Sequence, residues 1–101
     1  MRQDFREEGG TVLVKLEGSM YVEGAAMLRE RLLAFSEKGL GRFVIDMSMV
    51  DYIDSSGLGV LVAVQKRALQ KNGEVVIVGL KGIVKELFEL TRLDKVFTVR
   101  E

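Results

Sequence analysis

Short β-rich runs separated by glycines define the strands of this 101-residue chain. Apolar residues at period two predict a strand over residues 11–16, ended by Gly18. The Gly9–Gly10 turn lets residues 3–7 pair back against it as an antiparallel edge strand. Nearly continuous apolar runs predict two strands buried on both faces, and a short apolar run predicts a terminal strand. These three strands fall at residues 43–47, 75–78 and 96–99.

Between the strands the apolar spacing becomes helical, which predicts three helices over residues 22–37, 55–71 and 82–91. The apolar stripe of the first helix consists of Val22, Ala25, Leu28, Leu32 and Phe35. The main apolar face of the second consists of Leu58, Leu61, Val62, Gln65, Ala68 and Leu69. Glycines after the first two helices, at 39, 41 and 73, are typical helix-ending residues.

The predicted order is β-β-α-β-α-β-α-β, which favours an α/β fold in a single domain spanning residues 1–101. Strands that alternate with helices predict a small, mixed and mostly parallel sheet of four to five strands with right-handed crossovers. The antiparallel edge strand is the exception to the parallel order.

Composition limits the functions open to such a domain. The chain has no cysteine and no histidine, and its 15 basic residues balance 15 acidic ones. Disulfides and thiolate metal sites are therefore excluded, and so are the commonest general base and metal ligand. Neutral charge argues against direct binding of nucleic acid. With no signal peptide and no long apolar stretch, we expect a soluble cytoplasmic protein without a membrane span, metal or cofactor.

The most distinctive segment is the entry into the second helix, Asp54-Ser55-Ser56-Gly57-Leu58-Gly59. We expect it at the carboxyl edge of the parallel strands, where functional groups gather in α/β sheets. It follows the predicted loop 48–54, beside the predicted loops 18–21 and 79–82. Asp54 suits the N-cap position, which places Ser55 and Ser56 in the first turn.

Gly57 and Gly59 each disfavour a helix by about 1 kcal/mol relative to alanine, which indicates a flat backbone that a partner or phosphate can approach. The segment also has a purely structural interpretation. In that case Asp54 caps the helix, the serines interact with solvent, and the glycines let helix and sheet pack closely.

Three chemical roles for Ser55 remain. As a nucleophile it would need a lysine base, and Lys66 lies about 16 Å farther along the helix axis. The segment could bind a nucleotide phosphate at the helix N-terminus, but it lacks the P-loop and dinucleotide-binding spacings. Alternatively, Ser55 could accept a phosphoryl group, which would scarcely disturb the fold but would prevent docking by burying charge. Apolar residues around it that we expect to be exposed are the docking candidates, Met20, Tyr21, Met49 and Val50. Ordinary packing of the loops is the alternative interpretation of each of them.

The six-residue motif, preceded by Val44-Ile45-Asp46-Met47 and Tyr52-Ile53, resembles the signature of STAS-domain anti-sigma factor antagonists. Leu16-Glu17-Gly18 and residues 84–91 are also similar to that family. The resemblance covers essentially the whole chain and implies the STAS fold.

The resemblance further implies a non-enzymatic regulator that binds an anti-sigma factor and so releases a sigma factor. The anti-sigma factor would also be a serine kinase that uses ATP to phosphorylate Ser55, and a separate serine phosphatase would reverse the reaction. Asp54 would position Ser55, while Gly57 and Gly59 would form the approach surface. Sporulation-type antagonists carry acidic residues where this chain has Ser19-Met20-Tyr21, which predicts a different partner or weaker phosphorylation. The alternative is a STAS scaffold or transporter-associated module without a phosphorylation cycle.

Overall fold

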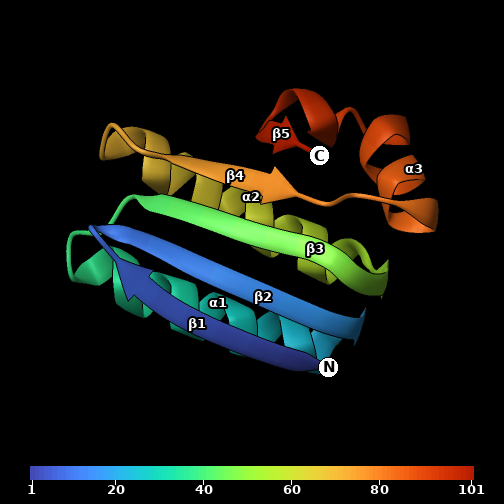
Figure 1. Ribbon diagram of the computed structural model, residues 1–101, viewed down its shortest axis with the longest axis horizontal. Helices are drawn as coiled ribbons and strands as arrows, with labels where there is room; N and C mark the ends of the chain where they lie inside the picture. Colours follow the sequence, from blue (N-terminus) through green and yellow to red (C-terminus); the bar gives the residue numbers. More distant parts are fainter.

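The computed structural model describes all 101 residues and contains five strands, three α-helices and one short 3₁₀ helix. In chain order they are β1 (Arg2–Glu8), β2 (Thr11–Met20), α1 (Val22–Glu37), β3 (Arg42–Ile53), α2 (Ser55–Gln70), β4 (Glu74–Val78), α3 (Gly82–Leu90), η1 (Leu93–Lys95) and β5 (Thr98–Arg100). The predicted β-β-α-β-α-β-α-β order is confirmed (Figure 1). None of the helices is long and apolar enough to cross a membrane.

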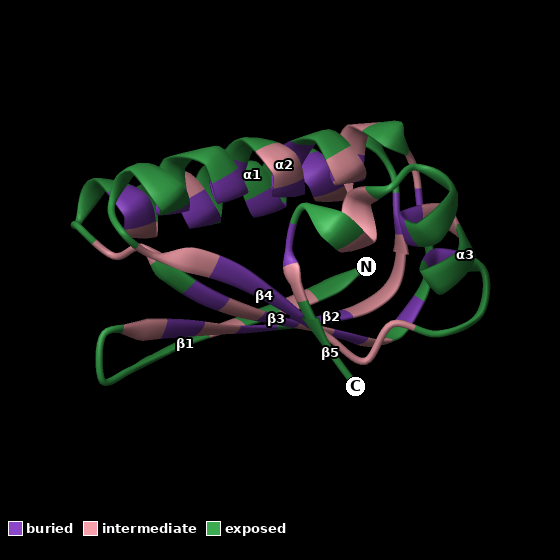
Figure 2. Ribbon diagram, turned by 90° about the horizontal axis from the view of Figure 1, so that it is seen from above, coloured by how far each residue is buried: buried purple, intermediate pink, exposed green.

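The strands lie in the sheet in the same order as in the chain, β1-β2-β3-β4-β5. β1 is antiparallel to β2, and all other neighbours are parallel, which confirms the mixed, mostly parallel sheet. Successive right-handed crossovers between neighbouring strands place their helices on the same face. Figure 2 shows α1 and α2 covering one face, while the opposite face remains open.

The main core contains 21 buried apolar residues, drawn from the sheet and all three helices. In β3, Phe43, Ile45 and Met47 are fully buried, whereas Val44 and Asp46 are only half-buried. The prediction that β3 is buried on both faces is therefore wrong, because helices cover only one face. In β4 the three central residues are all buried, as predicted.

The buried faces of α1 and α2 differ slightly from the predicted apolar faces. Val22 of α1 is 68% exposed and Leu69 of α2 is 57% exposed, so both predicted core positions are wrong. Val60 and Val64 are buried on α2 instead. Apolar residues occur on several sides of α2, so their spacing did not determine which side would face the sheet.

Two predicted loops are largely strand. β2 and β3 continue to Met20 and Ile53 and remain paired there, with register shifts at Lys15/Glu17 and Gly18/Ser19. At each shift β3 has an extra residue, and the pairing of the two strands resumes beyond it. The terminal strand begins at Thr98, two residues later than predicted, because η1 precedes it.

Candidate functional site

The predicted site lies where β3 passes directly into α2. The main-chain N–H of Asp54 donates to Met20 O at 3.1 Å, which fixes the end of β3 beside the end of β2. Asp54 is the N-cap of α2, and its carboxylate accepts from the main-chain N–H groups of Ser56 at 3.0 Å and Gly57 at 3.2 Å. The predicted cap is thus present and satisfies two donors that every helix start leaves free.

These contacts also determine the charge of Asp54. The Ser56 hydroxyl donates to the same carboxylate oxygen, and this bond is the largest cause of a lowered Asp54 pKa. The main-chain N–H groups of Gly57 and Ser56 lower the pKa further, while partial desolvation opposes them. Asp54 is therefore ionised at neutral pH, and its negative charge lies at the positive end of α2.

The two serines of the motif have different surroundings. Ser56 is partly buried and is held by Asp54, whereas Ser55 is exposed at the first helical position. The hydrogen bonds of this turn involve Ser56 and Gly57 and leave the Ser55 hydroxyl facing solvent. Of the two hydroxyls, that of Ser55 is the one an external enzyme or partner can reach.

The two glycines of the motif also differ. A Cβ on Gly57 would lie 2.6 Å from Ile53 Cγ1 and 2.7 Å from Met20 Sδ, so Gly57 is needed for packing against the core. A Cβ on Gly59 would have no atom within 4 Å, and Gly59 is exposed. Gly59 therefore has the exposure that the predicted approach surface requires, whereas Gly57 has the close-packing role of the structural interpretation.

The structure corrects the predicted docking residues. Tyr21 and Met49 are exposed, at 56% and 50%, but Met20 is fully buried and Val50 is 97% buried. Met20 packs beneath Gly57, and Val50 is part of the buried core. The prediction that these two are exposed is wrong, because the extended strands turn their side chains into the core.

Sequence reasoning missed two residues of this surface. Tyr52 is 37% exposed, and its ring lies 5.9 Å from that of Tyr21. Val22, which follows Tyr21 in the chain, is also exposed. Tyr21, Val22 and Tyr52 are called the tyrosine patch below. Buried residues of β3 beyond Met47 recur at intervals of three, Val50 and Ile53. Simple alternation therefore could not have identified which side chains face outward.

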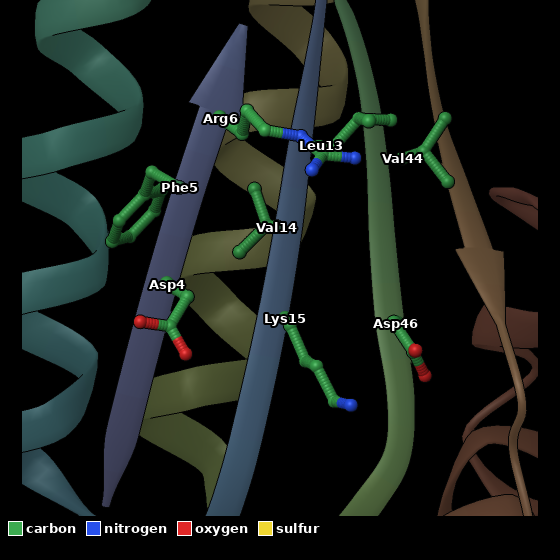
Figure 3. Close-up of a pocket in the computed structure, with 8 residues that line it drawn as sticks. All are labelled: Asp4, Phe5, Arg6, Leu13, Val14, Lys15, Val44 and Asp46. Carbon is green, nitrogen blue, oxygen red and sulfur yellow. The ribbon is translucent and has the colours of Figure 1, made fainter.

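A lysine and a carboxylate lie together on the open face of the sheet. Lys15 projects on the open sheet face near Asp46, and both residues line a groove of about 510 Å³ (Figure 3). Burial raises the pKa of Asp46, but hydrogen bonds from Ser48 and the charge of Lys15 together bring this pKa below its ordinary value. No group of three or more acidic side chains is placed to hold a metal ion.

Comparison with known proteins identifies the fold. The family model of the STAS domain matches residues 2–101. The chain belongs to the STAS domain family. The β3–α2 junction with its capped serine turn is thus part of a STAS domain that occupies nearly the whole chain.

Two curated relatives and one solved structure are similar to this STAS domain. BtrV of Bordetella bronchiseptica, named as a candidate anti-sigma factor antagonist, is 37% identical over 90 residues, 89% of this chain and 78% of BtrV. The anti-sigma-B factor antagonist of Staphylococcus aureus is 32% identical over 88 residues, 87% of this chain and 82% of that protein. The phosphorylated form of the Bacillus cell fate determinant SpoIIAA superposes with a TM-score of 0.82 at 14% identity, covering 99% of this chain and 92% of SpoIIAA.

Proposed function

We propose that this STAS domain is an anti-sigma factor antagonist whose binding is switched off by phosphorylation of Ser55. The names of its relatives support the antagonist role. The observation that carries the switch is the exposed Ser55 hydroxyl at the start of a helix in which Asp54 already accepts from the N–H groups of Ser56 and Gly57. A phosphoryl group there meets solvent in the free protein and breaks no internal hydrogen bond.

The same phosphoryl group acts strongly at an interface. It adds a charge of about −1.5 to −2, and a charge that a partner buries without compensation opposes docking. The tyrosine patch offers an apolar contact on the neighbouring end of β2 and β3, with Tyr52 paired opposite Ser19. Docking on this patch brings the partner next to Ser55, so the chemical state of Ser55 controls whether the patch can be used.

The proposed partner is an anti-sigma factor that is also a serine kinase and takes the phosphoryl group from ATP. A serine phosphatase removes the group and restores binding. In this cycle the STAS domain itself catalyses nothing and contacts no nucleic acid. It acts in the cytoplasm, where sigma factors act on RNA polymerase.

The first test is binding. The partner retained by the immobilised wild-type protein is purified and titrated with wild type, Ser55→Ala and Ser55→Asp. We expect Ser55→Ala to bind nearly as well as wild type and Ser55→Asp to bind at least about 100-fold more weakly. Gln70→Asp, which adds the same charge at an exposed position at the far end of α2, is the control and should bind normally. Undiminished binding by Ser55→Asp would contradict charge as the switch.

The second test is the modification itself. The purified partner is incubated with ATP and either wild type or Ser55→Ala, and the products are analysed by intact mass and site mapping. One phosphoryl group on Ser55 of wild type, and none on the variant, is the expected result. A protein that gains no phosphoryl group, or gains it on another residue, is not controlled through Ser55.

A further inference from the structure

Strand β1 leaves one edge of the sheet without a partner. It pairs with β2 along all seven of its residues, and it is the outermost strand on that side. Gly9 and Gly10, with φ of 57° and 83°, form the two-residue turn between them, so Glu8 and Thr11 form the first hydrogen-bonded pair. The alternation of an antiparallel ladder then directs the main-chain groups of Gln3, Phe5 and Glu7 away from β2.

The charges on β1 are ordered about its middle residue. Side chains alternate along the strand, so Arg2, Asp4, Arg6 and Glu8 lie on the face opposite Phe5, which packs against α1. Figure 3 shows Asp4 and Arg6 on either side of Phe5, the middle residue of this series. When two such strands pair antiparallel with Phe5 opposite Phe5, a residue before Phe5 in one strand lies opposite the residue equally far after Phe5 in the other. Arg2 then lies opposite Glu8 and Asp4 opposite Arg6, so all four pairs combine opposite charges.

We propose that β1 pairs with β1 of a second copy of this chain about a two-fold axis at Phe5. The two five-stranded sheets then become one continuous sheet. The register that matches the charges also matches the main-chain groups. Phe5 lies opposite Phe5 and Gln3 opposite Glu7, and these are the residues whose N–H and C=O groups point outward, giving about six new hydrogen bonds.

The other edge of the sheet is less suited to pairing. β5 has only three residues, Thr98–Arg100, and therefore offers few main-chain groups. Charged residues usually protect an edge strand from association. The charged residues of β1 oppose its pairing with most partners and in most registers. In the two-fold register about Phe5, however, the same charges form cross-strand pairs of opposite sign.

The helix beside this edge is also compatible with a second copy. An axis perpendicular to the sheet keeps both α1 helices on the same face, next to each other. Phe5 already packs against α1, with its ring 6.2 Å from that of Phe35 and 4.4 Å from the Arg31 guanidinium. Met27, on the neighbouring turn, is 58% exposed and is available for contact between the helices. This dimer does not involve Ser55, so the dimer proposal does not depend on the proposed phosphorylation switch.

Two single variants test the charge register. Arg6→Glu places two carboxylates opposite each other twice in its homodimer, and Asp4→Arg does the same with two cations. Sedimentation velocity over a wide concentration range should show reversible dimers of wild type and a dissociation constant at least about tenfold higher for either variant alone. An equimolar mixture of the two variants restores all opposite-charge pairs and should dimerise nearly as well as wild type. Wild type that remains monomeric, or a mixture no better than its components, would overturn the proposal.

A cysteine crosslink tests the axis itself, because the chain has no cysteine of its own. Residues in a hydrogen-bonded antiparallel pair lie within the Cα distance that a disulfide requires. Phe5→Cys should therefore form a covalent dimer under mild oxidation. Glu7→Cys is the matched control, since residue 7 lies opposite residue 3 and not opposite itself. Equal crosslinking of both variants, or none of folded Phe5→Cys, would show that β1 does not pair in this register.

Discussion

Helices α1 and α2 begin next to each other, after the paired ends of β2 and β3, but their first turns differ. Asp54 caps α2 with its carboxylate, whereas Tyr21, in the same position of α1, makes no side-chain cap. The first residue of α2 is a free serine, and that of α1 is an exposed valine. One start is polar and internally satisfied, and the other is apolar and uncapped. We therefore assign the switch to α2 and the contact surface to α1.

Among variants that remove a side chain at one of the two helix starts, the largest effect should come from removing the contact at the start of α1. We expect Tyr21→Ala to weaken partner binding at least about 30-fold, the scale of an interface hot spot, because it also removes the stacking partner of Tyr52. Titration calorimetry with the purified partner measures this. Leu90→Ala removes a side chain that is 80% exposed on α3 and serves as the control. If the two variants bind alike, the tyrosine patch is not the contact.

Both helices have glycine as their third residue. Substitution by alanine at each of these positions distinguishes how tightly the two first turns are packed. A Cβ on Gly57 would clash with the core, but a Cβ on Gly24 would lie at 3.5 Å or more from its neighbours. We expect Gly57→Ala to lower the free energy of unfolding by about 1–2 kcal/mol, the overpacking cost minus the gain in helix propensity. Gly24→Ala should leave it unchanged or raise it by up to about 1 kcal/mol. Urea unfolding measures both, and equal effects would mean that the two turns pack alike.

Removing the cap should have a smaller effect on stability. Asp54→Ala deprives Ser56 and Gly57 of their hydrogen-bond acceptor, so we expect the Tm to fall by about 5 °C. Asp54→Asn retains an acceptor oxygen and should lose less. Thermal unfolding by circular dichroism measures both variants. A Tm of Asp54→Ala equal to that of wild type would show that the capped and uncapped starts are equally stable.

The smallest effect is the pH dependence of the cap. Folding lowers the Asp54 pKa below its ordinary value of 3.8, so its contribution to stability is complete above that pH and is lost as pH falls through the lower folded value. The Thr98 hydroxyl lowers the pKa of Glu74 in the same way. This contribution of Glu74 is the same in wild type and in Asp54→Asn. Between about pH 5 and pH 2, Asp54→Asn should therefore lose less stability than wild type. Parallel losses would mean that Asp54 does not contribute in this way.

The accuracy of the sequence predictions differs between the capped turn and the surface beside it. Asp54 was correctly placed as an N-cap because capping depends on neighbouring residues in the chain, and the start of α2 at Ser55 followed from it. The exposure of Met20 and Val50 was predicted wrongly. It depends on register shifts between β2 and β3, which no local pattern reveals.

By itself, the sequence determined the order of the elements, the fold class and the capped serine turn, because periodicity, glycine punctuation and capping are local properties of the chain. Only the tertiary structure decided which glycine of the motif packs against the core and which is open to solvent. It also placed Tyr21 against Tyr52, residues that approach only when β2 and β3 pair. Side-chain burial at the ends of strands depends on what lies across the sheet, and distant segments of the chain supply those neighbours.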